Sequence, residues 1–227
     1  MTATAPKRLG IIIPSYNDPR ILKAIESVRA FGDVGAVSII LMDGGSKPEL
    51  VARMAAQLTP DDILVSEPDK GIFDALNKGL EACTTEYIGW IGSDDMFSGH
   101  VPASEVIRTL ETCDLFVANT AHVQGDMVTR ITHSRPSRHK LARFGLNNPH
   151  FSTFGRSALL KRERFPLDLR GADIEYFLRI FNYNPNVITT DKISTYMEAG
   201  GFSNSSYKAI LKTNKELYGV YRRHIPA

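Results

Sequence analysis

The first hundred residues alternate between mostly apolar runs and amphipathic segments. Four runs are rich in aliphatic residues and then end in polar or turn-forming residues: 9–17, 36–46, 61–71 and 87–97. Such runs are typical of strands that are buried on both faces. The segments after the first three runs space their apolar side chains as amphipathic helices do: 18–31, 48–58 and 72–83. This alternation predicts an α/β fold in which helices flank a mostly parallel central sheet.

The second half of the chain is less regular. Residues 114–132 predict two strands joined by a hairpin, residues 172–183 predict a helix, and residues 186–200 predict a further strand. The final segment, 206–227, places aromatic and aliphatic side chains near one helical stripe, which indicates an amphipathic helix. Because the sequence contains no internal repeat, low-complexity segment or clear linker, we expect a single domain over residues 1–227.

Composition narrows the possible functions only slightly. The 227 residues carry a formal net charge of +2, which argues neither for nor against a nucleic-acid partner. Two cysteines make neither a disulfide framework nor a zinc cluster, so we expect a reducing, cytoplasmic setting. The sequence shows no signal-peptide core and no run of about 20 apolar residues that could cross a bilayer, so we expect any membrane contact to be peripheral.

Polar residues gather where the predicted strands end. Ligands of parallel α/β sheets bind beyond the carboxyl ends of the strands, so these ends should meet at one edge. Asp94 and Asp95 are neighbours there, and both stay ionised only where water, hydrogen-bond donors or a cation compensate for their repulsion. A divalent metal such as Mg²⁺ would do so, because it prefers carboxylate oxygens and shares its remaining positions with water and phosphates. The alternative is a solvated turn whose acids cap a helix.

Five motifs follow one another along the chain: "IIIPSYN", "MDGGS", "SEPDKGIFDALNKG", "IGWIGSDD" and "GADIEYFLR". In this order and spacing they resemble the family-2 glycosyltransferases over residues 8–200, and most of all bacterial members that build surface polysaccharides. The resemblance implies the GT-A fold and an inverting transfer from a nucleotide-diphosphate sugar, most commonly a UDP-sugar, that depends on Mn²⁺ or Mg²⁺. It also implies a nucleotide-sugar-binding half at 8–98 and an acceptor-binding half at 99–205, followed by the C-terminal helix.

The resemblance assigns roles on the donor side of the site. The matching residues are Pro14, Ser15, Tyr16, Asn17, Asp43, Asp69, Asp94 and Asp95. The first four form the loop that would hold the base, with the tyrosine near its ring. Asp43 would contact the base or the ribose, and Asp69 would make another nucleotide contact. Asp94 would reach the ribose, and Asp95 would bind the metal beneath the diphosphate.

The resemblance also assigns the general base. An acceptor hydroxyl has a pKa far above 7, so a carboxylate within hydrogen-bond reach must take its proton as the new bond forms. Asp173 matches the base of the family, and Glu175 is the alternative, because the usual preceding glutamate is Ala172 here. Without the resemblance, Asp173 would be explained as an acid favoured by the dipole at a helix N-terminus.

Other positions leave phosphate and acceptor binding open. Leu76 replaces an arginine that many members carry, so Lys70 or a residue of the acid-free basic stretch 127–162 would have to supply that charge. His150 matches a "PH" pair of the family and would contact the donor phosphates or the acceptor, unless it is structural. The basic stretch would meet a phosphate-bearing acceptor, such as a polyprenyl-linked saccharide, or would be a solvated loop. It lacks the interleaved aromatic residues and fold signature of a nucleic-acid site.

These observations favour an enzyme that transfers a sugar to a glycan or lipid-linked glycan. A catalytically inactive nucleotide-sugar-binding partner subunit is the alternative, but a binding module does not need Asp173. A nucleotidyltransferase would want a glycine-rich, basic loop after the first strand, and "PSYNDPR" is a poor version of one. The C-terminal helix would either pack against the core or lie on an anionic membrane surface.

Overall fold

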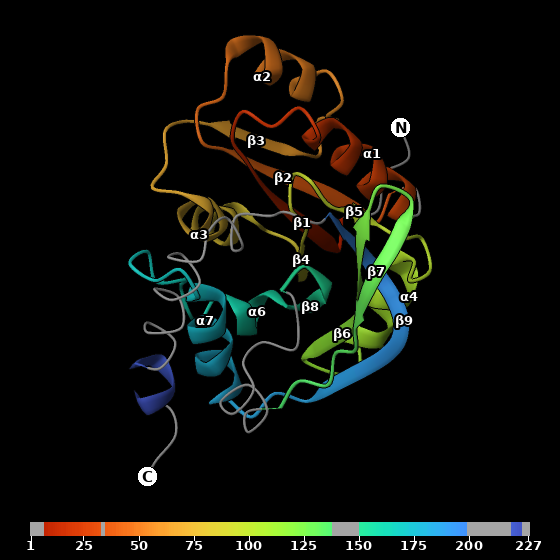
Figure 1. Ribbon diagram of the computed structural model, residues 1–227, viewed down its shortest axis with the longest axis vertical. Helices are drawn as coiled ribbons and strands as arrows, with labels where there is room; N and C mark the ends of the chain where they lie inside the picture. Colours follow the sequence, from red (N-terminus) through yellow and green to blue (C-terminus); the bar gives the residue numbers. More distant parts are fainter. Residues whose placement is uncertain (1–6, 33–34, 138–149, 199–218, 224–227) are drawn as a thin grey trace.

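The computed structural model describes residues 7–32, 35–137, 150–198 and 219–223. Its strands are β1 (Leu9–Ser15), β2 (Val37–Asp43), β3 (Ile63–Ser66), β4 (Tyr87–Trp90), β5 (Met96–Phe97), β6 (Leu115–Gln124), β7 (Met127–Thr132), β8 (Thr153–Arg156) and β9 (Val187–Glu198). Its helices are α1 (Ile21–Phe31), α2 (Pro48–Ala55), α3 (Ile72–Ala82), α4 (Ala103–Leu110), the 3₁₀ turn η1 (His150–Ser152), α6 (Ser157–Leu160) and α7 (Ala172–Phe181). The described strands form one sheet in the order β3-β2-β1-β4-β8-β6-β9-β5, with β7 paired to β6 (Figure 1).

The first half of the sheet is parallel, as the sequence predicts. β1 lies between β2 and β4 and runs parallel to both, and β3 extends the same arrangement beyond β2. All seven residues of β1 are buried, because helices cover both faces of the sheet. Ile11 and Ile13 face one apolar core and Ile12 faces the other, as the two-residue period of a strand requires.

The two cores lie on opposite faces of the sheet. One contains the buried sides of α1, α2 and α4, and the other contains those of α3, α6 and α7. Figure 1 shows α3, α6 and α7 together on one side of the molecule. Trp90, at the end of β4, meets the rings of Tyr176 and Phe177 edge-on, with centroids 6.5 and 6.1 Å away. This packing brings α7 close to the carboxyl end of β4.

The second half of the sheet is mixed. β6 runs parallel to β9 but antiparallel to β7 and β8, and β8 is antiparallel to β4. The hairpin over 114–132 and the helix over 172–183 are confirmed. The sequence analysis did not identify α4, and it missed β5, β8 and α6, which are only two to four residues long.

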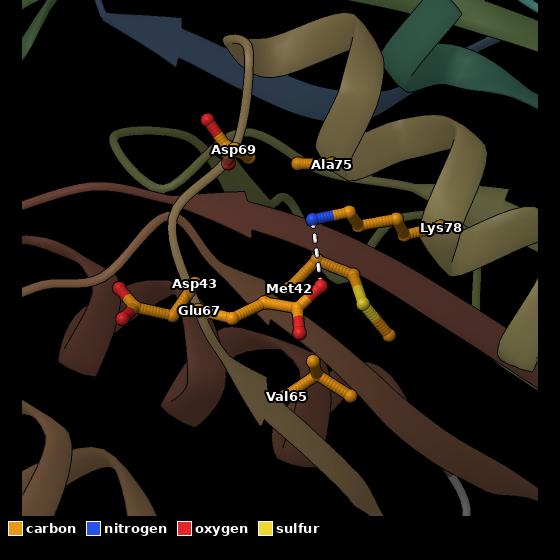
Figure 2. A pocket seen from close by; sticks show the side chains of 7 residues that line it. All are labelled: Met42, Asp43, Val65, Glu67, Asp69, Ala75 and Lys78. Carbon is orange, nitrogen blue, oxygen red and sulfur yellow. Dashed lines mark ion pairs between the residues drawn. The ribbon is translucent and has the colours of Figure 1, made fainter.

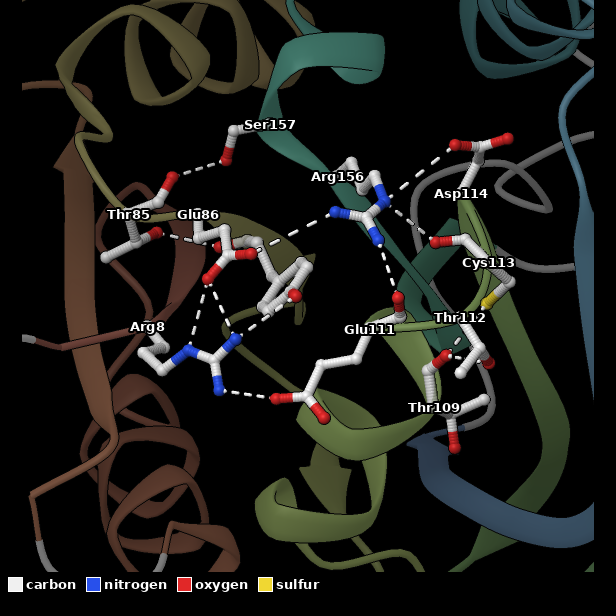
Figure 3. Close-up of polar contacts among 11 residues, drawn as sticks. Arg8, Thr85, Glu86, Thr109, Glu111, Thr112, Cys113, Asp114, Arg156 and Ser157 are labelled. Carbon is white, nitrogen blue, oxygen red and sulfur yellow. Dashed lines mark hydrogen bonds and ion pairs between the residues drawn. The ribbon is translucent and has the colours of Figure 1, made fainter.

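Arginines neutralise the acids at the amino ends of the central strands (Figure 3). The guanidinium of Arg8 lies 2.9 Å from Glu86 and 2.8 Å from Glu111. Arg156 donates through Nε to the carbonyl of Cys113 at 2.9 Å and lies 3.8 Å from Asp114. This end of the sheet is closed by ion pairs, which leaves the carboxyl ends of the strands as the place for a ligand.

Two segments singled out in the sequence are described only in part. Of the C-terminal segment, residues 219–223 are helical, and Val220 is buried in the same core as α7. Of the basic stretch, residues 138–149 lie outside the described residues, and with them Arg138, His139, Lys140 and Arg143. Arg135, which is described, pairs with Asp191 of β9. In the described ranges, no helix is long and apolar enough to cross a membrane.

Candidate active site

The loops after β1 and β2 are joined to each other. Ser15 and Asp43 are partners in the strand register, so the two strands end side by side. Beyond them, the N–H of Asn17 donates to Ser46 Oγ at 2.7 Å, and the Asn17 side-chain oxygen accepts from the N–H of Lys47 at 3.0 Å. Asn17 holds a left-handed backbone with φ 50°, which asparagine adopts more readily than most residues.

This junction leaves Tyr16 exposed. Its side chain is 66% exposed, and its ring can therefore meet a ligand beyond the strand ends. Pro14 and Ser15 are buried inside β1 and shape the strand end rather than offering side chains to solvent. Ser15 Oγ finds no hydrogen-bond partner among the described residues.

Asp43 organises the loop that follows β2. Its carboxylate is 2% exposed and accepts hydrogen bonds from the N–H groups of Gly45 (3.2 Å) and Ser46 (2.8 Å). It also accepts from the hydroxyls of Ser46 and Ser66, the latter at 2.7 Å. These contacts give Asp43 a structural task, and its contact with a nucleotide stays a prediction.

A narrow crevice with no room for a water molecule lies beside Asp43, between the ends of β2 and β3 and the helix α3 (Figure 2). Its lining residues are Met42, Asp43, Val65, Glu67, Asp69, Ala75 and Lys78. The ammonium of Lys78 lies 2.7 Å from Glu67 and 3.7 Å from Asp74, and Glu67 is the main cause that raises the pKa of Lys78. The sequence analysis did not name Glu67 or Lys78, because their pairing depends on how β3 and α3 pack.

Asp69 brings the third loop to the same edge. Its Oδ1 accepts from the N–H of Gly71, which has a φ of 108° that favours glycine. A Cβ on Gly44 would lie 2.7 Å from Asp69 Oδ2, so a larger residue at this position would displace the Asp69 carboxylate. Lys70 is exposed, while Leu76 is fully buried in the core.

The acid pair sits just beyond β4. Asp94 lies 3.5 Å from the guanidinium of Arg20, the residue before α1. The same guanidinium also forms an ion pair with Asp18. Asp95 is 3% exposed and accepts from the N–H of Glu198, at the end of β9, at 3.2 Å. Burial, together with the charge of Asp94, raises the pKa of Asp95 to about 7.

A divalent cation fits this pair of acids. Asp95 is buried beside the negative charge of Asp94, and a carboxylate in that position gains most from a cation. Mg²⁺-like ions are often held by one or two carboxylates together with water and phosphate oxygens. The described residues contain no group of three or more histidine, cysteine or acidic side chains able to hold a metal ion, so the remaining ligands would come from substrate and solvent.

Asp173 and His150 meet at the start of α7. The His150 Nδ1 lies 3.6 Å from Asp173 Oδ2, although the two residues come from separate elements. The second carboxylate oxygen, Oδ1, accepts from the N–H of Ile174 at 3.0 Å. The Asp173 side chain is 25% exposed, so it is reachable from solvent.

Glu175 is placed differently from Asp173. Its carboxylate is 3% exposed and lies 2.9 Å from Arg179 and 3.2 Å from Arg223. Each of its two oxygens is paired with a guanidinium group, so the buried carboxylate is not free to meet an acceptor hydroxyl. The Arg223 contact also fastens residues 219–223 to α7.

A sequence model described as "Glycosyl transferase family 2" matches residues 10–165. The chain belongs to this family. A "PGL/p-HBAD biosynthesis glycosyltransferase" of Mycobacterium bovis is 29% identical over an alignment of 216 positions that covers 88% of this chain and 81% of the relative. An "uncharacterized glycosyltransferase" of Mycobacterium tuberculosis is 30% identical over 108 residues. These matches confirm the resemblance drawn from the five motifs and identify the chain as a glycosyltransferase.

Solved glycosyltransferases share its fold. Residues 1–349 of TarS from S. aureus, in complex with UDP-GlcNAc, superpose with a TM-score of 0.68 at 19% identity, covering 88% of this chain and 61% of that one. The mannosyltransferase PcManGT from Pyrobaculum calidifontis, in complex with GDP-Man and Mn²⁺, gives a TM-score of 0.66 at 18% identity. It covers 99% of this chain and 68% of that one. The GT-A fold predicted from the sequence is thereby confirmed.

Proposed function

We propose that this glycosyltransferase moves a sugar, with inversion, from a nucleotide-diphosphate sugar to a hydroxyl of a glycan or lipid-linked glycan, with help from a divalent metal. The observation that carries the proposal is the arrangement at the carboxyl ends of the parallel strands. There Tyr16 is exposed, Asp94 and Asp95 form a poorly neutralised acid pair, and Asp173 presents an accessible carboxylate close to the end of β4.

The donor would lie across the loops after β1, β2 and β3. The exposed ring of Tyr16 offers a face on which a base can stack, and the half-buried Asp69 lies in the loop after β3. UDP is our first choice of nucleotide, in line with the UDP-GlcNAc complex of TarS, and GDP is the second, in line with the GDP-Man complex of PcManGT. The mycobacterial relatives are named for PGL/p-HBAD biosynthesis, which supports a biosynthetic acceptor.

Asp95, with Asp94 beside it, would hold the metal. When bound, the metal neutralises charge that develops on the departing diphosphate. The carboxylates fix where that positive charge sits, and the N–H of Glu198 fixes the orientation of Asp95. Arg20, 3.5 Å from Asp94, is a further cation near the phosphates, and it compensates in part for the arginine that Leu76 replaces.

Asp173 would act as the base. As the acceptor oxygen bonds to the anomeric carbon, its proton passes to the Asp173 carboxylate, and the bond from that carbon to the diphosphate breaks with its electron pair on the leaving group. A single displacement of this kind inverts the anomeric centre. Asp173 suits the task better than Glu175, because Glu175 is already paired with Arg179 and Arg223.

A set of donor-binding and turnover measurements tests this proposal. Melting temperatures are recorded with Mn²⁺ and each of UDP-GlcNAc, UDP-glucose, UDP-galactose and GDP-mannose, and the donor with the largest shift is carried into turnover assays. Asp173→Asn should keep the thermal shift and lose transfer and donor hydrolysis. An inactive binding subunit would show the shift without any turnover in the wild type, and EDTA should stop the turnover of an active enzyme.

A further inference from the structure

His150 is a buried histidine placed against the proposed base. It begins η1, which packs against β4, β6 and β9, and it is 8% exposed. Its ring lies on Phe151, with centroids 3.8 Å apart, and Phe165 lies 6.5 Å away. The aromatic contacts leave the imidazole little freedom to turn, so the direction in which each ring nitrogen points is set by the fold.

The two ring nitrogens have different surroundings. Nδ1 lies 3.6 Å from Asp173 Oδ2, whereas Nε2 is buried and finds no hydrogen-bond partner among the described residues. A proton on Nε2 would be a buried donor without an acceptor, and such donors are costly. A proton on Nδ1 instead faces a carboxylate and leaves only a bare lone pair on Nε2. The neutral tautomer with its proton on Nδ1 therefore fits this site best.

We propose that His150 is a positioning residue for Asp173, which it holds through Nδ1–H. The inference rests on the proposed role of Asp173 as base. Oδ2 of Asp173 faces the imidazole at 3.6 Å, longer than a hydrogen bond, and Oδ1 accepts from the N–H of Ile174 at 3.0 Å, so the two contacts orient the carboxylate. The remaining lone pairs of the carboxylate then face the acceptor hydroxyl. Contacts of this kind shorten when substrates fill a site.

The proposal assigns no proton to His150 during transfer. The hydroxyl proton ends on Asp173, and the histidine keeps its own proton on Nδ1 throughout. His150 therefore acts on the rate of the chemical step and leaves donor binding unchanged. A contact of Nε2 with donor phosphates or with the acceptor would instead alter the binding of that substrate.

Two amide substitutions separate these roles. An asparagine at 150 places its side-chain N–H₂ near the position of Nδ1, and a glutamine places it near that of Nε2. Hydrolysis of the chosen nucleotide sugar by water needs no acceptor and uses the same base, so kcat and KM are measured from the release of nucleotide. We expect His150→Asn to keep kcat within about fivefold of wild type, and His150→Gln and His150→Ala to lose about 30- to 100-fold, with the donor KM unchanged.

Several results would overturn the proposal. The first is a higher kcat in the glutamine variant than in the asparagine variant. The second is a rise in the donor KM in place of a fall in kcat, and the third is full activity in the alanine variant. Turnover by Asp173→Asn would instead refute the base itself, which keeps the two failures distinct. A second measurement needs no variant of His150: ¹⁵N-histidine NMR of the folded chain should show one histidine protonated on Nδ1 whose signals move in Asp173→Asn. Absence of such a histidine would refute the contact.

Discussion

Asp62 is a buried acid that joins three parts of the parallel half of the sheet. It precedes β3, its side chain is 0% exposed, and it forms an ion pair with Arg29 of α1. It also accepts from the N–H of Ile39 in β2 and from the N–H of Thr59, both at 2.7 Å. Asp62→Asn removes the charge and one acceptor while keeping the size of the side chain, so the variant isolates the value of the ionised carboxylate.

The expected cost follows from the burial of the pair. Removing one member of a buried ion pair costs about 3–5 kcal/mol, and since Arg29 is 33% exposed we expect the lower end, about 3 kcal/mol. For a chain of this size each kcal/mol shifts the melting temperature by about 2–4 °C, so Asp62→Asn should melt about 6–12 °C below wild type at pH 7. Asp61→Asn is the matched control, because Asp61 is 53% exposed and its pair with Lys7 should contribute at most about 1 kcal/mol.

The pH dependence has a definite sign. Burial raises the pKa of the Asp62 carboxyl, but the hydrogen bonds from Arg29, Ile39 and Thr59 outweigh this effect and lower it below the usual value. The carboxylate therefore stabilises the fold fully above the unfolded-state pKa of about 3.9, and this contribution is lost as the pH falls through the lower folded-state value. Thermal and urea unfolding from pH 7 to pH 2.5 measures it. Equal melting of the Asp62 and Asp61 variants at pH 7, or a gap that widens in acid, would refute the reasoning.

Two further predictions concern the loops and the chain end. In Gly44→Ala the new methyl group would displace the Asp69 carboxylate, so the proposed contact of Asp69 with the nucleotide should weaken. Nucleotide affinity, measured by calorimetry with Mn²⁺, should then fall by about tenfold, equivalent to about 1.4 kcal/mol; unchanged affinity would contradict this. Arg223→Ala removes the contact with Glu175, so amide hydrogen exchange of residues 219–223 should become faster. Arg222→Ala, at an exposed neighbouring position, is the control and should exchange as the wild type does. Equal exchange rates in the two variants would show that the ion pair does not hold this segment.

Much of the fold could be predicted because local patterns decide it. Buried strands such as β1 and β2 are apolar on both faces, and this pattern can be recognised without knowing how the rest of the chain folds. The motifs predict Asp94 and Asp95 just after a buried strand and Asp173 at the start of a helix, and the structure places them beyond β4 and in the first turn of α7. The short strand β5 has only two residues, too few to carry a pattern of their own.

The roles of individual side chains were harder to predict, because they depend on tertiary contacts. The "MDGGS" motif itself supplies three of the four hydrogen bonds to the Asp43 carboxylate, but nothing in it shows that Ser66 of β3 supplies the fourth. The contact between His150 and Asp173 joins elements that only the packed fold brings together. Likewise, the sequence leaves Glu175 as a candidate base, and only the fold shows that its carboxylate is paired with two arginines.

The most direct test of the account is the melting temperature of wild type and Asp95→Ala with UDP, each with and without Mn²⁺. The account predicts that Mn²⁺ and UDP together raise the melting temperature of the wild type well above the effect of either alone, and that Asp95→Ala loses this joint increase while remaining folded. Two results would contradict a metal-held diphosphate at this edge of the sheet. One is an equal joint rise in melting temperature in Asp95→Ala; the other is no joint rise in the wild type, with UDP or with any of the four nucleotide sugars.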